Sequence, residues 1–414
     1  MLAGMSVLFL LTSLAQVPLP EDISLTPPSP SIAHGIAAFV GAWQGEWNDD
    51  FPTALVVEQI CQDGKTRVVY SWGDLEMRGI KAGWRRQTGI ILGGKLHLTS
   101  TNGASMDFTL EQNGNLFGQY KLTNGPPSLV ELVRIPGTNS SIIIATASKP
   151  FHLWTEIQIP EHSQVGVTAG KTLMLQATLY RPPSPGRHPV VIFNHGSTGP
   201  GIIPASYVSR GGNETVFFRS LDYVVVVPMR KGRGASEGPP MEEDPAIPLT
   251  VGLNSAVEDL NAVVEYMDRQ PYVDPARIMV AGVSRGGMLS VVYAGRYPTN
   301  VIGVINFSGG WFSEDSTNAD FNFEAFREAG RTAKVPMLWL YADHDSLYSL
   351  NFDEREFAAF RSTGGRGELF EVRDFPGEGH FLVAWPGQWE SKVADYLNGI
   401  SKTVHQLHTV KTGD

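Results

Sequence analysis

The chain has 414 residues, of which 42% are hydrophobic and 18% are charged, so it is long enough for two ordinary globular domains. Its formal net charge of -10 and its lack of a basic block exclude nucleic acid and anionic membranes as the main partners. We therefore expect a soluble protein whose partner is a small-molecule or acylated substrate.

The first residues have the pattern of an export signal. Residues 5–14 form an apolar stretch too short to span a bilayer, and Ser13 and Ala15 provide a small-x-small cleavage pattern. We predict a signal peptide over residues 1–15, a periplasmic or secreted protein, and no membrane anchor, because no cysteine lies at the cut for a lipid to modify. No Lys or Arg precedes the apolar stretch, so a misplaced start or a simple hydrophobic arm is an alternative interpretation.

A proline- and serine-rich stretch predicts a linker over residues 16–40, and β-rich runs follow it in residues 41–148. Three pairs of these runs are separated by turn dipeptides, and each pair predicts a hairpin. The pairs are 53–60 with 66–72, 89–92 with 95–99, and 106–110 with 116–120. We predict a small antiparallel β-barrel or β-sandwich domain over residues 41–148.

Aromatic residues are frequent in this first domain, with Trp43, Trp47, Trp72 and Trp84 among alternating polar residues. They could line a ligand cavity, but filling the core is the more common use in a small barrel. Cys61 is the only cysteine of the chain, so no intramolecular disulfide can form, and we assign it no chemistry.

Strand and helix signals alternate in residues 149–402, which predicts an α/β domain, and a polar tail follows over residues 403–414. No helix signal separates the first two candidate strands, so we expect that pair to be antiparallel. Apolar stripes predict helices over 253–267, from the turn near residue 284 to Arg296, and over 388–398. The candidate strands are 152–159, 173–180, 189–194, 223–228, 277–281, 301–307, 337–341 and 368–373.

Residues 278–287, IMVAGVSRGG, predict a strand, a sharp turn and a helix with Ser284 at the apex. A serine at such an apex has a strained backbone, so the positions two before and two after must lack side chains, and Gly282 and Gly286 meet this need. Ser284 is the candidate nucleophile, and the amide of Arg285 at the helix start could donate to an oxyanion. By itself, Gly-x-Ser-x-Gly also occurs in ordinary turns.

A serine nucleophile needs a general base and a carboxylate that orients the base, and after this kind of turn the acid precedes the histidine. His380 lies in the glycine-rich loop FPGEGHF after an extended segment, whereas His405 and His408 lie in the polar tail. The run LYADHD leaves a strand and offers Asp343 or Asp345 as the acid, and the residue pattern does not choose between them.

Another glycine-bearing loop, HGSTG at residues 195–199, follows an apolar strand. It could present the N–H of Ser197 or Thr198 to the same oxyanion that Arg285 serves. His195 precedes the serine in the chain, and we interpret it as holding the shape of the loop rather than as the base.

These motifs resemble the α/β-hydrolase family, nearest to its dienelactone hydrolase-like and prolyl oligopeptidase-like branches, over about residues 151–400. The resemblance is carried by HGSTG at 195–199, RKGRGASEG at 230–238, GVSRGG at 282–287, LYADHD at 340–345 and GEGHF at 377–381. It implies a mostly parallel eight-stranded sheet with flanking helices, and it favours Asp345 as the acid, although Ala342 stands where the family usually has glycine. It also implies that the loop at 230–238 shapes the site rather than reacting, and it favours Arg230 and Arg233 as structural ion-pair partners over the alternative that they clamp the substrate. We recognise no family for the first domain.

The constellation of Ser284, Asp345 and His380 predicts a serine hydrolase that cleaves an ester through an acyl-enzyme intermediate, with no metal or organic cofactor required. A serine peptidase or acylaminoacyl hydrolase is the alternative, although the chain lacks the long N-terminal propeller of prolyl oligopeptidase-like enzymes. A non-catalytic carbohydrate- or lipid-binding protein is a further alternative. Loop order places three aromatic residues where they could line an apolar acyl pocket or only pack the loops, namely Trp311, Phe312 and Trp385.

Overall fold

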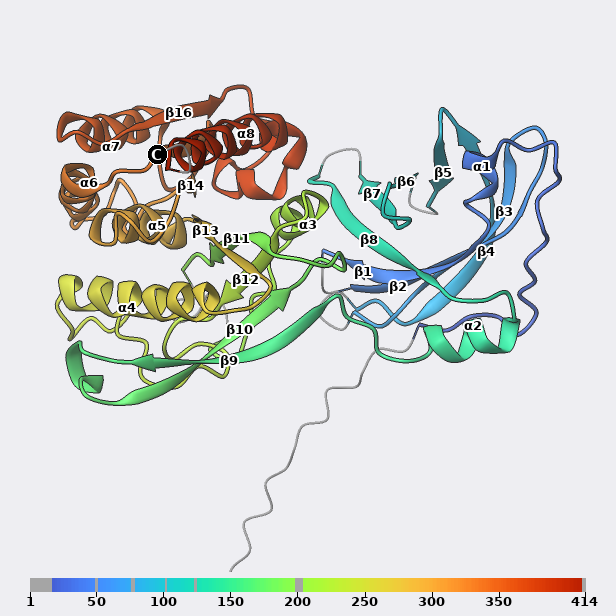
Figure 1. The fold of residues 1–414 in the computed structure, drawn as a ribbon, viewed down its shortest axis with the longest axis horizontal. Helices are drawn as coiled ribbons and strands as arrows, with labels where there is room; N and C mark the ends of the chain where they lie inside the picture. The colour runs from blue at the N-terminus through green and yellow to red at the C-terminus, as the bar shows by residue number, and fades with distance from the viewer. Residues whose placement is uncertain are drawn as a thin grey trace, which may run out of the picture. The chain divides into compact units, whose positions relative to one another are not determined.

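The computed structural model describes residues 17–48, 51–75, 79–100, 103–122, 125–197 and 204–411, with side chains described up to residue 401 (Figure 1). The chain divides into two compact units, and the boundary between them lies between Leu153 and Trp154. The predicted signal peptide lies outside the described residues. No helix in the described part of the chain combines the length and the apolar character that crossing a membrane needs.

The first unit is a closed barrel of eight antiparallel strands, each paired with the next in the chain, and β1 pairs with β8 to complete the circle. This confirms the predicted barrel, and the three predicted hairpins are β2–β3, β4–β5 and β6–β7. The turn signals did not reveal β1 and β8. The strands are β1 (Gly41–Trp47), β2 (Phe51–Ile60), β3 (Lys65–Trp72), β4 (Gly83–Leu92), β5 (Lys95–Thr99), β6 (Ser105–Leu110), β7 (Leu116–Lys121) and β8 (Ser128–Ile135).

The interior of the barrel is filled by side chains. Trp43 and Trp47 are buried in one apolar cluster with Phe108, while Trp84 is 44% exposed. Gly118 shares this interior, and a Cβ there would lie 2.6 Å from a Val130 methyl group, closer than real contacts allow. The buried tryptophans therefore pack the core of the barrel.

The outer face of the barrel is covered over β1, β2, β3 and β8 by helix α2 (Ser140–Ala147) and by residues near the start of the described chain. Val17 and Ile23, which fall in the predicted linker, are buried against this face. The short helix α1 (His34–Ala37) also lies within the predicted linker range. Residues 17–40 thus contribute to the packing of the first unit.

The second unit contains a twisted eight-stranded sheet in the order β16-β15-β14-β13-β11-β12-β10-β9. β10 is antiparallel to both of its neighbours, and the other pairs are parallel. This confirms the predicted α/β-hydrolase sheet and its antiparallel first pair. The strands are β9 (Trp154–His162), β10 (Thr172–Tyr180), β11 (His188–Asn194), β12 (Val224–Pro228), β13 (Val273–Val283), β14 (Val304–Phe307), β15 (Met337–Ala342) and β16 (Gly367–Val372).

Helices cover this sheet in two groups. Apolar side chains of α4, α5 and α6 share one core cluster with the strands, as expected for residues that are buried on one helical face. α3 and α8 contact each other through Phe217 and Trp389, whose rings are 5.0 Å apart. The helices are α3 (Asn213–Ser220), α4 (Leu249–Asp268), α5 (Arg285–Arg296), α6 (Asp320–Thr332), α7 (Leu350–Ser362) and α8 (Pro386–Lys411), with short 3-10 turns η2 (Gly166–Thr168) and η3 (Gly379–Ala384).

The parallel strands deliver the candidate site residues to one edge of the sheet. β11 ends just before His195, β13 ends at the residue before Ser284, β15 ends before Asp343, and β16 leads to the loop that carries His380. The carboxyl ends of parallel strands lie at the same edge, where α/β proteins bind their ligands.

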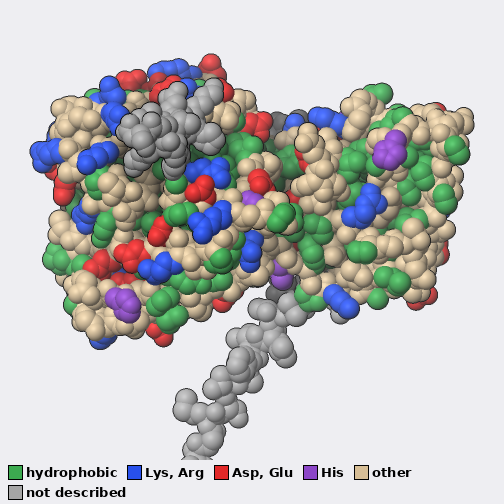
Figure 2. Space-filling model, viewed as in Figure 1, with side chains coloured by type: hydrophobic (Ala, Val, Ile, Leu, Met, Phe, Trp, Pro, Cys, Tyr) green, Lys and Arg blue, Asp and Glu red, His purple; other side chains and the backbone are tan. Residues whose placement is uncertain are grey.

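On the face in Figure 2, acidic and basic side chains are interspersed rather than gathered by sign.

Candidate active site

Ser284 lies at the junction of β13 and α5 with φ 55° and ψ -126°, a conformation that is costly for a residue other than glycine. A Cβ on Gly282 would collide with the carbonyl oxygen of Gly286, and one on Gly286 would collide with that of Asn194. The glycines are therefore needed because three backbone segments meet at the turn. The turn holds Ser284 at the carboxyl edge of the sheet, where 9% of the residue is exposed.

The loop after β11 lies directly against Ser284. A Cβ on Gly196 would be 3.3 Å from the Cβ of Ser284. Arg230 holds the other side of this loop, because its Nη1 donates to the His195 carbonyl at 2.8 Å and its Nη2 donates to the Gly196 carbonyl at 3.1 Å. In a trans peptide the N–H points opposite to the carbonyl, so the Ser197 N–H points away from Arg230.

Two backbone N–H groups are candidate oxyanion donors near Ser284, the candidate nucleophile. Arg285 opens α5, and the first amides of a helix have no partner within the helix. Its N–H and that of Ser197 are the two candidate oxyanion donors among the described residues. Thr198, the third predicted donor, lies outside the described residues.

His195 is held in its neutral form. Burial, together with the positive charge of Arg230, lowers the pKa of His195 to about 3. Its Nδ1 donates to the Gly196 carbonyl at 2.8 Å, so its Nε2 is the ring acceptor and receives the Arg230 amide at 3.4 Å. The histidine is engaged on both nitrogens within the loop, which agrees with a role in holding the loop's shape.

A buried cluster of ion pairs packs against this loop through Arg230. Arg230 Nε is 2.9 Å from Glu242, Arg233 pairs with Glu243, and Arg285 lies 3.6 Å from Glu243. None of the five side chains is more than 12% exposed. These arginines make structural ion pairs, as the motif comparison implies.

Asp345 and His380, the predicted acid and base, lie within hydrogen-bond distance of each other. Asp345 Oδ2 lies 3.0 Å from His380 Nδ1, and Asp345 Oδ1 accepts the amides of Leu347 at 2.8 Å and Tyr348 at 3.1 Å. The Asp345 side chain is 1% exposed and that of His380 is 11% exposed. A carboxylate at Nδ1 fixes the proton there and leaves Nε2 as the acceptor, as a general base requires.

Asp343 has a different environment. Its carboxylate accepts the amides of Asp374 at 2.6 Å and Phe375 at 2.8 Å and so braces the turn after β16. Burial raises the pKa of Asp343, but these amide hydrogen bonds outweigh it and hold the pKa below its ordinary value. The geometry therefore favours Asp345 over Asp343 as the orienting acid. His344, between them, has a 65% exposed side chain.

The remaining predicted site residues have the following surroundings. Within the described part of the chain, Ser284 and His380 share no direct hydrogen bond, and catalytic hydrogen bonds often form only when substrate binds. Trp311 is 4% exposed, with the Arg285 guanidinium 4.9 Å from its ring centre, so it packs beneath the site. Phe312 packs against Phe321, and Trp385 packs against Phe375. All three aromatic residues make packing contacts, and their role as the lining of an acyl pocket stays a prediction.

Two residues near the acid and base were not singled out from the sequence. The ring of Tyr348 lies 5.6 Å from that of His380, and Tyr348 is 2% exposed. Glu378 accepts hydrogen bonds from the amides of Ser346 and His380. The only sequence signal for Glu378 is its place in the GEGHF run, two residues before the histidine.

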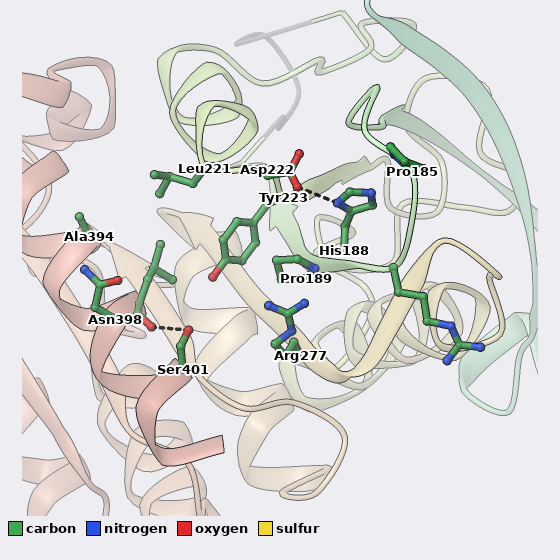
Figure 3. Close-up of a pocket in the computed structure, with 12 residues that line it drawn as sticks. Pro185, His188, Pro189, Leu221, Asp222, Tyr223, Arg277, Ala394, Asn398 and Ser401 are labelled. Atoms are coloured by element: carbon green, nitrogen blue, oxygen red, sulfur yellow. Dashed lines mark hydrogen bonds and ion pairs between the residues drawn. The ribbon is translucent and has the colours of Figure 1, made fainter. Parts of the chain in front are cut away.

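A separate cavity of about 390 Å³ lies at the opposite edge of the sheet (Figure 3). His188 and Tyr223 border it from the starts of β11 and β12, and Asn398 and Ser401 border it from α8. His188 is paired with Asp222 at 3.1 Å. None of the predicted site residues lines this cavity. In the described part of the chain, no three His, Cys, Asp or Glu residues are grouped as metal ligands.

Comparison with known proteins places this geometry in a family. A sequence model described as the dienelactone hydrolase family matches residues 175–387, a range that contains every predicted catalytic residue. No curated protein sequence matches the chain.

Several solved structures resemble the fold. The esterase Pf2001 of Pyrococcus furiosus is 15% identical, with a TM-score of 0.43 over 59% of this chain and 89% of its own. Acetyl xylan esterase 1 of Thermoanaerobacterium sp. JW/SL YS485 is 16% identical, with a TM-score of 0.39 over 56% of this chain and 86% of its own. A dipeptidyl aminopeptidase IV-like protein of Bacteroides ovatus ATCC 8483 is 17% identical, with a TM-score of 0.42 over 83% of this chain and 50% of its own.

Proposed function

The chain belongs to the dienelactone hydrolase family, and on this premise we propose that it is a serine hydrolase that cleaves carboxylic esters through an acyl-enzyme intermediate. The observation that carries the proposal is the meeting, at one sheet edge, of a strained Ser284 with a hydrogen-bonded pair of Asp345 and His380. A nucleophile, a base and an orienting acid in this chain order are what acyl transfer needs.

In the proposed reaction, Ser284 Oγ attacks the ester carbonyl carbon while His380 Nε2 accepts the hydroxyl proton. Asp345 holds the imidazole by its Nδ1–H and stabilises the imidazolium that forms. The amides of Arg285 and Ser197 donate to the oxyanion of the tetrahedral intermediate. The C–O bond to the alcohol then breaks, and His380 returns its proton to the leaving oxygen.

The second half of the reaction uses the same groups. Water attacks the acyl carbon while His380 takes one of its protons, and a second tetrahedral intermediate forms at the same amides. Collapse of this intermediate breaks the bond to Ser284 Oγ, which recovers its proton from His380. The acid product leaves, and the enzyme returns to its starting state.

The first prediction concerns the nucleophile. Ser284→Ala should reduce kcat on a small activated ester by several orders of magnitude, because no other hydroxyl occupies the strained apex. The wild-type protein should also be labelled covalently by a fluorophosphonate probe, and the variant should not. Full activity of Ser284→Ala would exclude the proposed mechanism, and failure of the folded wild type to label would favour the non-catalytic binding protein.

The second prediction concerns the acid. Asp345→Asn should reduce kcat by about 10⁴-fold because the amide favours the wrong tautomer of the base. Asp343→Asn removes a brace between two loops and should affect thermal stability more than kcat. Steady-state kinetics and thermal unfolding of both variants measure this difference. A larger loss of kcat in Asp343→Asn, at intact folding, would reverse the assignment.

Substrate class can be tested with matched pairs. An esterase and a serine peptidase or acylaminoacyl hydrolase use the same nucleophile, base and acid, so variants of these residues do not separate them. The same acyl group presented as an ester and as an amide does separate them, because only the leaving group differs. We expect cleavage of the ester and little cleavage of the amide. Comparable kcat/KM values for both would support the peptidase alternative.

A further inference from the structure

The acid loop and the histidine loop are packed backbone to backbone. The Gly379 N–H donates to the His344 carbonyl at 3.1 Å. A Cβ on Gly379 would collide with the Asp343 carbonyl oxygen and lie 2.7 Å from the Asp345 nitrogen. The loop that carries the base can reach the acid only because glycine stands at this position. The residue before this glycine is therefore placed over the acid loop.

That residue, Glu378, binds both loops through one carboxylate oxygen. Its Oε1 accepts the Ser346 amide at 2.9 Å and the His380 amide at 3.3 Å. Ser346 directly follows the acid Asp345 in the chain. One side chain thus links the residue next to the acid with the backbone of the base itself.

The carboxylate of Glu378 is ionised at neutral pH. Burial raises its pKa, but the hydrogen bonds from the Ser346 and His380 amides outweigh burial and hold the pKa below the ordinary value. The positive charge that His380 carries when protonated lowers it further. Glu378 therefore places a negative charge beside the histidine that the proposed mechanism protonates.

The bond to Ser346 distinguishes this arrangement from a simple helix cap. Glu378 stands at the N-cap of η3, where an acceptor for the His380 amide is expected. A cap needs no partner 32 residues away, yet the shorter of the two hydrogen bonds goes to Ser346 on the acid loop. The side chain thus adds a second link between two loops that the Gly379 amide already joins through the His344 carbonyl.

We propose that Glu378 is a positioning residue for the reaction, an inference that rests on the proposed function of Asp345 and His380. It sets the distance between acid and base by joining their loops, and its charge favours the imidazolium of His380 in the transition state. It makes no contact with the reacting atoms in this scheme. Substitution of Glu378 should lower kcat and leave KM little changed, because Glu378 does not take part in binding the substrate in its ground state.

Two variants separate the two effects. Glu378→Gln keeps an acceptor oxygen but removes the charge, so kcat should fall modestly while the acidic limb of the pH–rate profile moves to lower pH. Glu378→Ala removes the link as well, and kcat should fall by between about tenfold and a hundredfold, as expected when a catalytic group is misplaced. Glu390→Gln, an exposed glutamate on α8, is the matched control and should match the wild type.

A spectroscopic measurement tests the inference without relying on turnover. In the Ser284→Ala background, the proton between His380 Nδ1 and Asp345 should give a downfield NMR resonance. Glu378→Ala should weaken this resonance or speed its exchange with water, whereas Glu390→Gln should leave it unchanged. An unchanged resonance, kcat and pH profile in folded Glu378→Ala would overturn the inference. The proposed function would stand in that case, provided that Ser284→Ala remains inactive and the wild type is labelled.

Discussion

The guanidinium of Arg230 contacts the candidate site through the backbone of the loop after β11. Its guanidinium donates to the carbonyls of His195 and Gly196 and pairs through Nε with Glu242. Three acceptors in different directions match the planar fork of arginine, which lysine cannot reproduce. The arginine therefore fixes which side of the Gly196 peptide faces Ser284, and with it the direction of a proposed oxyanion donor.

We predict that Arg230→Lys lowers kcat by about a hundredfold with a smaller change in KM. The variant misdirects the Ser197 N–H, and this donor stabilises the oxyanion of the transition state more than it stabilises the bound substrate. Arg233→Lys is the matched control, since Arg233 belongs to the same buried cluster and pairs with Glu243. Kinetics on an activated ester and circular dichroism spectra of both variants measure the effect. Equal losses in the two variants would show that the cluster acts only through stability.

Lys231, the next residue, joins three elements. It follows β12, its side chain is 1% exposed, and its Nζ pairs with Asp259 of α4 and with Glu161 of β9 at 3.0 Å. Its own amide also donates to Asp259 at 2.9 Å. The lysine thus ties the antiparallel part of the sheet to the helix that covers it.

Lys231→Met should lower the free energy of unfolding by about 3–5 kcal/mol, because it leaves two buried carboxylates without their cation. Lys392→Met is the control, since Lys392 pairs with Glu368 at the surface, where such pairs contribute about 1 kcal/mol or less. Urea denaturation of the two variants should differ accordingly. If Lys231→Met lowers the free energy of unfolding no more than Lys392→Met does, the buried ion pairs of Lys231 make no net contribution to stability.

Elements with a strong local signal could be predicted from the sequence. Turn dipeptides such as Asp63-Gly64 marked the hairpins, and apolar runs marked the central strands of the second unit. β1 and β8 were missed because their partners are distant in sequence, and only closure of the barrel pairs them. The β-branched run at residues 142–144 resembles a strand, yet it is helical in α2, where Asn139 accepts the Ile142 amide and Ile143 is buried.

The candidate site shows the same division. Ser284 and His380 could be named because one directly follows an apolar strand and the other lies in a glycine-rich loop, whereas Asp345 was preferred to Asp343 only through the family resemblance. The resemblance implied the ion pairs of Arg230, but its hydrogen bonds to the His195 loop and the contacts of Glu378 could not be predicted, because they depend on how loops 30 or more residues apart meet in space. The local sequence pattern thus predicts the candidate reacting residues, whereas the residues that position them are found only from tertiary contacts.

Across the whole molecule, the net charge of -10 includes acids that the fold removes from water. Asp353 and Glu356 lie three residues apart on α7, and neither is exposed to solvent. The carboxyl oxygens of Asp353 have no hydrogen-bond partner among the described residues. Ionised carboxylates in such surroundings would be very costly, so the native state favours their protonated forms.

These buried acids make stability depend on pH. Burial, together with the charges of Glu356 and Asp345, raises the pKa of Asp353 to about 10, and burial raises the pKa of Glu356 well above its ordinary value. In the unfolded chain both groups lose their protons near pH 4. Between about pH 4 and pH 10 the native state therefore binds more protons than the unfolded state, so these groups make the protein less stable as pH rises.

We predict that Asp353→Asn raises the Tm of the second unit at pH 8 by about 2–4 °C for each kcal/mol gained, since the amide has nearly the same shape and no proton to lose. The gain should shrink toward pH 5, because the unfolded state of the wild type then gains less free energy by releasing the Asp353 proton. Scanning calorimetry of wild type, Asp353→Asn and the exposed neighbour variant Glu354→Gln from pH 5 to pH 9 measures both effects. Glu354 forms only a surface contact with Arg373 at 3.6 Å, so its variant should keep the pH dependence of the wild type. A gain in Asp353→Asn that did not grow with pH would mean that Asp353 is already ionised in the native protein, with a cation or ordered water supplying the partner that the described residues lack.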